Sequence, residues 1–328
     1  MKKYMAYITR MVPEKVILHL KEHCDVGVNQ EDRPLDRIEL LKAVKGMHAV
    51  MTMLNDKVDT ELMDRAGSQC RIISNYAVGY NNIDVPAATE RGIYISNTPD
   101  VLTDSTADMA WALLLAAARR VVEGDRTTRS GGFKGWSPLF MLGVEVSGKT
   151  LGIVGAGRIG QAIVRRAQGF GMRILYTANN PRPDFEIATG ATFVGLNTLL
   201  SESDFISLHV PLTEQTHHMI GPGEFAIMKE SAILINTARG PVVDEKALAD
   251  ALRIGEIRAA GLDVYEREPE VEKDLLSLDN VVLCPHLGSS TLETRERMGL
   301  MAADNIIAAL RGEVPPQCLN PAAGNPGR

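Results

Sequence analysis

Short β-branched or aliphatic runs alternate with amphipathic stretches along almost the whole chain of 328 residues. This alternation is typical of parallel sheets whose strands are joined by helices. Residues 1–100 carry five candidate strands and four candidate helices: Tyr4–Thr9, Asp25–Val28, Ala49–Leu54, Arg71–Asn75 and Ile93–Ser96 as strands, and Glu14–His23, Arg37–Val44, Thr60–Ala66 and Val85–Glu90 as helices. We expect them to form one compact doubly wound unit.

A second set of strands follows a helical stretch, Ser105–Glu123, that is apolar on nearly every side and reads as a buried connector. The irregular segment Arg126–Gly148, called the arm below, has no periodic pattern and is expected to be functional or to lie at an interface. The strands expected after it are Thr150–Val154, Met172–Thr177, Phe205–Val210, Ala232–Thr237, Ala259–Val264 and Val281–Cys284, with Ala191–Val194 as a weaker candidate. The fold class is therefore α/β, with two doubly wound parallel-sheet domains.

The end of the chain carries one more helical pattern, Leu292–Leu310, with Gly312 as its stop signal. The segment Pro315–Arg328 is rich in Pro, Gly and Asn, and we expect it to fray.

Composition excludes several classes of protein. A net charge of −6, without a Lys/Arg run longer than two, argues against nucleic-acid binding. The longest apolar run, Met109–Ala118, is about half of what a membrane-spanning helix needs, so no membrane association is expected. The N-terminus lacks the pattern of a signal peptide, and the four cysteines form no CxxC pair. We expect a cytoplasmic protein with reduced thiols and no metal site.

The strand Thr150–Val154 leads into Gly-Ala-Gly-Arg-Ile-Gly, residues 155–160, and a helix follows. In such a loop Gly155 permits the tight turn, Gly157 lets the backbone approach a pyrophosphate, and Gly160 lets the helix pack closely on the strand. The helix N-terminus offers N–H groups to the anion. Because the flanking strand and helix are both present, the motif predicts dinucleotide binding.

The next strand ends without an acidic residue. In NAD-binding domains an Asp or Glu at this place hydrogen-bonds the ribose 2′-hydroxyl, whereas the nearest carboxylate here is Asp184, beyond two prolines. A 2′-phosphate is therefore permitted, and Asn179, Asn180 and Arg182 could donate to it. We expect NADP(H) to be favoured, with NAD(H) as the alternative.

Arg239, Glu268 and His286 each follow a different strand of the second set. Since parallel strands end at one edge of a sheet, these side chains are expected near the glycine loop. An arginine can clamp a carboxylate and polarise the adjacent carbonyl, and a histidine can protonate the oxygen as hydride arrives at carbon. A carboxylate on the other ring nitrogen fixes the tautomer. The trio fits reduction of a 2-keto acid with hydride from a nicotinamide cofactor.

These motifs resemble the D-isomer-specific 2-hydroxyacid dehydrogenase family over nearly the whole chain. The resemblance rests on residues 155–160, Asn236–Asp244, Gly261–Val264 with Glu268-Pro269, and Pro285–Gly288. Within the family the chain is most similar to the glyoxylate/hydroxypyruvate reductases, through Leu175–Thr177, Pro181–Pro183 and Trp136–Leu139. Many NADP-using reductases of this type carry an Arg where Asn179 stands here.

The resemblance implies that Arg239 binds substrate, that His286 is the proton donor and that Glu268 is its partner. Leu54 and the backbone of Val78 and Gly79 would complete the substrate site. The cofactor-binding residues expected in total are Thr106, Gly155, Gly157, Arg158, Ile159, Gly160, Asn179, Asn180, Arg182, Val210, Pro211, Thr216, Thr237, Ala238, Arg239, Asp263, His286 and Gly288. Asp263 would hold the nicotinamide carboxamide.

The resemblance also implies a substrate domain of residues 1–100 plus 289–328 and a dinucleotide-binding domain of residues 101–288. A dimerisation segment at about residues 123–148, which includes the arm, would wrap a second subunit of a homodimer, and Trp136 could cap that subunit's pocket. The function expected is NADPH-favouring reduction of glyoxylate and hydroxypyruvate. Alternatives are a 3-phosphoglycerate or other D-2-hydroxyacid dehydrogenase and, from another class, a nucleotide-sensing corepressor-like binding protein.

Overall fold

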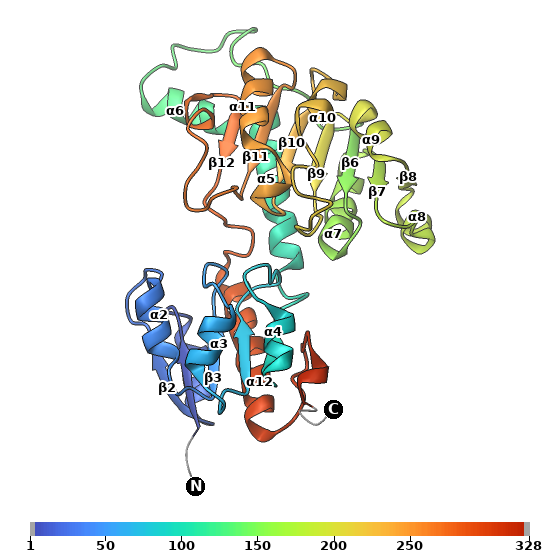
Figure 1. Cartoon of the computed structure of the whole chain (residues 1–328). Coiled ribbons are helices and arrows are strands. Elements are labelled where there is room, and N and C mark those ends of the chain that lie inside the picture. The colour runs from blue at the N-terminus through green and yellow to red at the C-terminus, as the bar shows by residue number, and fades with distance from the viewer. Residues whose placement is uncertain (1–3, 325–328) are drawn as a thin grey trace. The chain divides into compact units, whose positions relative to one another are not determined.

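A computed structural model describes residues 4–324 and divides the chain into two compact units (Figure 1). The first unit contains the chain up to Leu102 and from Ser290 onward, and the second is Thr103–Ser289. Each unit has a parallel sheet of its own, with helices on its faces. The expected α/β class with two doubly wound parallel sheets is confirmed.

The sheet of the first unit has five strands in the order β2-β1-β3-β4-β5, and every neighbouring pair is parallel. This is the strand order of flavodoxin-like folds. The strands are β1 Met5–Ile8, β2 Asp25–Val28, β3 Ala49–Thr52, β4 Ile72–Asn75 and β5 Tyr94–Ser96, and the α-helices are α1 Glu14–Lys21, α2 Arg37–Val44, α3 Thr60–Ala66, α4 Val85–Glu90 and α12 Leu292–Arg311.

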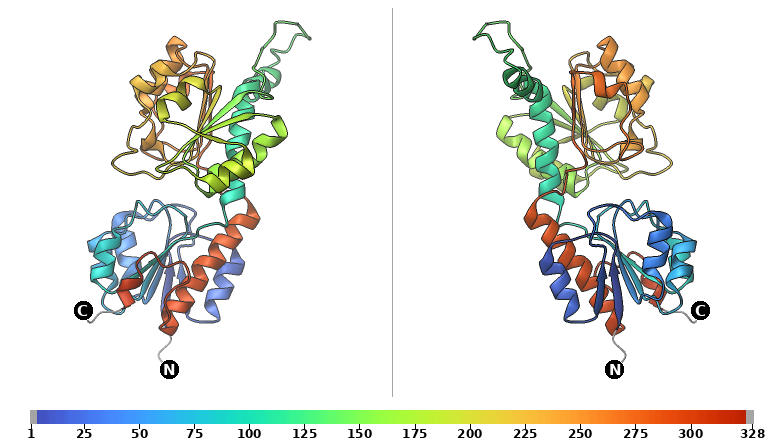
Figure 2. Two further views of the ribbon diagram at one scale, coloured as in Figure 1. Left: turned by 90° about the vertical axis from the view of Figure 1, so that its right-hand side faces the viewer. Right: turned by 90° about the vertical axis from the view of Figure 1, so that its left-hand side faces the viewer.

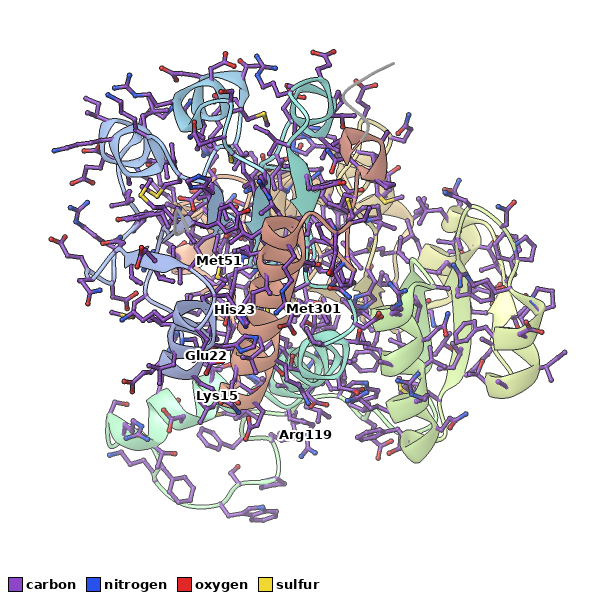
Figure 3. All side chains as sticks on the ribbon, turned by 90° about the horizontal axis from the view of Figure 1, so that it is seen from below. Lys15, Glu22, His23, Met51, Arg119 and Met301 are labelled. Atoms are coloured by element: carbon purple, nitrogen blue, oxygen red, sulfur yellow. The ribbon has the colours of Figure 1, made fainter. Side chains whose placement is uncertain are left out.

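Helix starts in the first unit are set by short polar side chains. Asp36, Asp59 and Asp84 accept hydrogen bonds from backbone N–H groups in the first turns of α2, α3 and α4. The long helix α12 packs beside α1 (Figure 3), and His19 Nε2 of α1 lies 2.8 Å from Asp304 Oδ1 of α12.

The sheet of the second unit has seven strands in the order β12-β11-β10-β9-β6-β7-β8, which is the Rossmann order with one added strand. Its strands are β6 Thr150–Val154, β7 Arg173–Thr177, β8 Thr192–Phe193, β9 Phe205–Leu208, β10 Ile233–Asn236, β11 Ala259–Leu262 and β12 Val281–Leu283. Its α-helices are α5 Thr103–Arg119, α6 Val121–Arg129, α7 Arg158–Ala167, α8 Pro183–Thr189, α9 Leu196–Glu202, α10 Pro222–Ile227 and α11 Glu245–Ile254.

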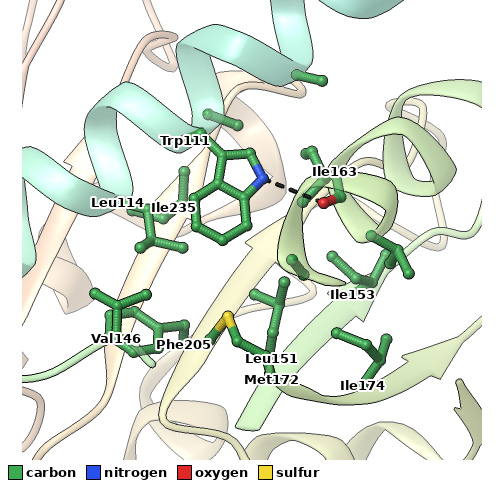
Figure 4. Close-up of a cluster of buried hydrophobic side chains, with 14 of the residues drawn as sticks. Trp111, Leu114, Val146, Leu151, Ile153, Ile163, Met172, Ile174, Phe205 and Ile235 are labelled. Atoms are coloured by element: carbon green, nitrogen blue, oxygen red, sulfur yellow. Dashed lines mark hydrogen bonds between the residues drawn. The ribbon is translucent and has the colours of Figure 1, made fainter. Parts of the chain in front are cut away.

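Both faces of this second sheet are covered, so its strands are aliphatic on both sides. Along β10, Ile233 and Ile235 join the core cluster shared with α5 and α7, while Leu234 joins the cluster on the opposite face. Trp111 of α5 fills the first cluster (Figure 4), where its ring stacks on Phe170 at a centroid distance of 4.7 Å.

The expected single helix Ser105–Glu123 is wrong only in its last residues, because α5 ends at Arg119. Arg120 has a φ of 54°, in the left-handed region that ends a helix, and its side chain pairs with Glu123. A separate helix, α6, therefore occupies the beginning of the arm. The loop that follows α6 extends away from the body of the second unit (Figure 2), whereas Val146, near the end of the arm, is buried in the core of that unit.

The expected fraying after Pro315 is also wrong for the residues that the structure describes. The Leu319 N–H donates to Ile95 O of β5 at 2.8 Å. The buried Asn320 side chain accepts from Ile95 N at 2.7 Å and donates to Ile93 O at 2.9 Å. Residues 325–328 of the expected frayed segment lie outside the described residues.

Candidate active site

The glycine loop between β6 and α7 is shaped by close backbone contacts. Gly155 has a φ of 100°, and a Cβ there would lie 2.6 Å from His209 O. A Cβ on Gly160 would lie 2.3 Å from Gly155 O, so both positions require glycine. A Cβ on Gly157, in contrast, would meet no described atom within 4 Å. The space beside Gly157 is open to a ligand.

This loop forms one wall of an open groove of about 510 Å³. The groove is lined by Gly155–Gly157, Ala178–Arg182 and His209–Pro211, which bring together three loops at the carboxyl edge of the sheet. α7 begins at this groove. Its N-cap residue is Gly157, which has no side chain that could accept a hydrogen bond from the first N–H groups of the helix. The helix N-terminus therefore presents N–H groups and a positive dipole end to an anion.

The loop that carries Asn179 is fixed at its base by Tyr176. The buried Tyr176 hydroxyl accepts from Arg182 N at 2.6 Å and donates to Glu186 Oε1 at 2.7 Å. Asn179 and Asn180 are exposed on the groove, and no acidic residue lines it. The residues that line the groove therefore include no carboxylate that would repel a phosphate.

His209 directly follows β9 and forms part of the groove wall. Burial lowers its pKa to about 3, so the ring is neutral, and Nε2 lies 2.7 Å from Ser207 Oγ. Within residues 4–324, His209 Nδ1 and Thr237 Oγ1 are buried side-chain atoms without a hydrogen-bond partner. Both belong to strand-end segments on the groove side of the sheet.

Arg239 follows β10. Its backbone is extended, and the residue is half-buried. Burial lowers the pKa of its guanidinium, and the negative charge of nearby Glu268 partly offsets that effect. Gly240 explains the proximity, because a Cβ there would lie 1.8 Å from the carbonyl carbon of Tyr265. The loops after β10 and β11 are thus in direct backbone contact.

Glu268 and His286 form a hydrogen-bonded pair, with Glu268 Oε2 at 2.8 Å from His286 Nδ1. The other carboxylate oxygen, Oε1, accepts from Tyr265 N at 3.1 Å. Burial alone would raise the pKa of Glu268, but the hydrogen bond and the charge of His286 lower it below its ordinary value. The structure therefore brings the three expected catalytic residues together.

Asp263 clamps the backbone that follows His286. Its two carboxylate oxygens accept from Leu287 N at 2.6 Å and Gly288 N at 2.7 Å. Burial raises the pKa of Asp263, and these hydrogen bonds partly offset the rise. A Cβ on Gly288 would lie 3.4 Å from Thr106 Cγ2, so Thr106 reaches the same place from α5.

The remaining expected cofactor contacts separate into two groups. Val210 and Pro211 line the groove, and Arg158 and Ile159 begin α7 beside it. Thr216 instead donates its hydroxyl to Pro211 O at 2.6 Å, within its own loop. Ala238 is buried two residues after the end of β10.

Leu54, Val78 and Gly79 belong to the first unit, on the loops that follow β3 and β4. Asn97 Nδ2 donates to Val78 O at 2.7 Å, and Asn75 Nδ2 donates to Gly79 O at 2.8 Å. Sequence reasoning missed these two asparagines. Their signal was an amide side chain at or directly after the end of an aliphatic strand.

Among the described residues no group of three or more His, Cys, Asp or Glu side chains could hold a metal ion. The same residues include no helix of the length and apolarity required to span a bilayer.

A nicotinamide dinucleotide fits these residues. The open space at Gly157, the uncapped start of α7 and the two unpartnered polar atoms are the features that such a ligand would use. The loop glycines would hold the pyrophosphate, and Thr237 and Asp263 lie on the side of the catalytic pair.

Comparison with known proteins defines the class. Residues 111–288 match the family model described as D-isomer specific 2-hydroxyacid dehydrogenase, NAD binding domain. The chain belongs to the D-isomer-specific 2-hydroxyacid dehydrogenase family, as the sequence motifs predicted.

Particular relatives are similar over the full length. A glyoxylate reductase of Thermococcus kodakarensis is 55% identical, over 96% of this chain and 95% of the relative, and one of Korarchaeum cryptofilum is 52% identical, over 97% and 96%. The crystal structure of an NADPH-dependent glyoxylate/hydroxypyruvate reductase from Sinorhizobium meliloti, in complex with NADP and malonate, matches with a TM-score of 0.84 at 32% identity, over 98% of both chains.

Two alanine substitutions separate ligand approach from packing in the glycine loop. We expect Gly157→Ala to leave the melting temperature unchanged but to weaken NADPH binding about tenfold or more, because the methyl group enters the space for the pyrophosphate. Gly160→Ala is expected to cost about 2–4 kcal/mol of stability through its clash with Gly155. Thermal melting and a fluorescence titration with NADPH measure both effects. Unchanged NADPH affinity in Gly157→Ala would contradict the assignment of the groove.

Proposed function

We propose that this protein reduces glyoxylate and hydroxypyruvate to the corresponding 2-hydroxy acids, with NADPH favoured over NADH. The observation that carries the proposal is the 2.8 Å contact between Glu268 Oε2 and His286 Nδ1, beside the half-buried Arg239. The names of the full-length relatives, glyoxylate reductases, support the choice of substrate.

In this proposal Arg239 binds the keto acid through its carboxylate and polarises the keto oxygen. His286 donates the proton from Nε2, because Nδ1 is engaged with Glu268. Glu268 stabilises the protonated ring and keeps its orientation. The bound nicotinamide would supply the hydride. The N–H groups of Val78 and Gly79 would receive the substrate carboxylate, and Leu54 would line the same pocket.

The preference for NADPH is supported by the groove wall. Asn179 and Asn180 lie where a carboxylate would repel a 2′-phosphate, and Arg182 adds a positive charge. The Sinorhizobium meliloti reductase, which is in complex with NADP, supports the same choice.

We also propose a homodimer built on the arm. Phe133, Trp136 and Leu139 are 56%, 85% and 80% exposed, and a cluster of large apolar side chains on an extended segment marks a protein interface. Light scattering is expected to give twice the chain mass of 35.7 kDa. The triple Ser variant at these positions is expected to give the monomer mass, and an unchanged dimer would contradict this role of the arm.

Substitution of the trio tests the reaction. We expect His286→Ala to lower kcat by roughly 10²- to 10⁴-fold, the usual contribution of general acid catalysis. Arg239→Ala is expected to raise KM for the keto acid and to lower kcat/KM by roughly 10- to 150-fold, as for loss of a charged hydrogen bond. Loss of NADPH absorbance at 340 nm measures both. Arg173→Ala, at an exposed arginine paired with Glu202, is the control and is expected to retain activity.

A substrate panel in the same assay distinguishes the alternatives. Glyoxylate and hydroxypyruvate are expected to turn over faster than pyruvate and 3-phosphohydroxypyruvate. Preference for the phosphorylated acid would make the protein a 3-phosphoglycerate dehydrogenase. NADPH binding without turnover of any keto acid would make it a nucleotide-sensing binding protein. Full activity in either Arg239→Ala or His286→Ala would remove that residue from the mechanism.

A single charge change tests the cofactor preference. We expect Asn179→Asp to lower kcat/KM for NADPH about tenfold, because the new carboxylate repels the 2′-phosphate, and to leave NADH within about twofold or improve it. Asn197→Asp, at an exposed position on α9, makes the same charge change outside the groove and serves as the control. A wild-type preference for NADH would overturn the assignment of NADPH.

A further inference from the structure

Tyr265 makes hydrogen bonds to Glu268 and to the segment that leads to His286. Its backbone N–H donates to Glu268 Oε1 at 3.1 Å, and its hydroxyl donates to Cys284 O at 2.9 Å. Cys284 follows β12 and stands two residues before His286. The Tyr265 side chain is buried, with the residue 7% exposed.

We propose that Tyr265 is a positioning residue that holds the Glu268 carboxylate and the backbone leading to His286 at a fixed separation, so that the hydrogen bond between them is kept. What the pair does rests on the proposed function. The evidence for how the pair is held is independent of that function and consists of the contacts that Tyr265 makes.

The Cys284 carbonyl, which accepts from the Tyr265 hydroxyl, accepts a second hydrogen bond. Cys284 O also accepts from the backbone N–H of His286 at 3.1 Å. His286 has a φ of 57°, in the left-handed region that a non-glycine residue occupies only where its surroundings hold it there. The Tyr265 hydroxyl therefore anchors the same carbonyl that fixes this unusual backbone turn.

The Tyr265 hydroxyl stays protonated at neutral pH and therefore remains a donor. Burial raises the pKa of Tyr265, and Cys284, Asp263, Glu245 and Glu268, which face it from neighbouring segments, raise it further. The group is neutral wherever carboxylates and imidazoles titrate.

The loop that carries Tyr265 has further supports that do not involve the hydroxyl. Gly240 packs against the Tyr265 backbone, and Glu245 and Glu266 exchange hydrogen bonds: Glu266 N donates to Glu245 Oε1 at 2.6 Å, and Glu245 N donates to Glu266 Oε1 at 2.9 Å. Tyr265→Phe therefore removes one hydrogen bond while the loop stays in place.

The test measures the imidazole tautomer as well as the rate. In ¹⁵N-histidine-labelled wild-type protein without cofactor, the neutral ring of His286 is expected to carry its proton on Nδ1, because that atom donates to Glu268. His286→Ala identifies the signal among the seven histidines. In Tyr265→Phe we expect the fraction of His286 rings with the proton on Nδ1 to fall. We expect kcat to fall roughly 3- to 10-fold, while KM for the keto acid stays within about twofold of wild type.

Ser74→Ala is the matched control, since the buried Ser74 hydroxyl donates to Ala302 O at 3.1 Å in the first unit. It is expected to lower the melting temperature without a change in tautomer or kcat. If Tyr265→Phe behaves in the same way, the tyrosine is merely structural and the proposal is overturned. If wild type turns over no keto acid, the proposed function fails, and the tautomer measurement alone decides whether Tyr265 positions the pair.

Discussion

The candidate site depends on the close contact between the loops that follow β10 and β11. Parallel pairing of β10, β11 and β12 brings the three strand ends to one edge, but Arg239, Glu268 and His286 all lie several residues beyond those ends. The 1.8 Å separation that a Cβ on Gly240 would have from the Tyr265 carbonyl carbon shows that the first two loops touch through backbone alone. A side chain at Gly240 would push Arg239 away from Glu268.

Because the loops touch, their charges are coupled. Burial destabilises the charged forms of both Arg239 and Glu268, and the charge of each residue partly offsets this effect on the other. His286 completes the compensation through its hydrogen bond to Glu268. Removing one member would leave a poorly solvated charge beside the others, so the trio is expected to respond to mutation as a unit.

The strands could be predicted from sequence, because parallel strands with helices on both faces appear as aliphatic runs. The placement of Arg239, Glu268 and His286 at one edge of the sheet could also be predicted, because each follows the carboxyl end of a strand, where ligands bind in such sheets. Three features could not be predicted. The helix break at Arg120 is a local backbone conformation, and the packing of Asn320 depends on hydrogen bonds to a strand more than 200 residues earlier. The sequence likewise shows that Tyr265 follows a strand, but not that its hydroxyl reaches Cys284.

Asn75, Asn97 and Tyr265 share one structural task at the carboxyl edges of the two sheets. Each places a polar side-chain group on a carbonyl of a functional loop: Gly79, Val78 or Cys284. A loop whose carbonyls are held in this way keeps its N–H groups and side chains in defined directions without regular secondary structure. Under the proposed function, the carboxylate-binding loops and the proton donor are supported independently, one set in each unit. Substrate range could therefore change through the loops after β3 and β4 while the Glu268–His286 pair stays the same.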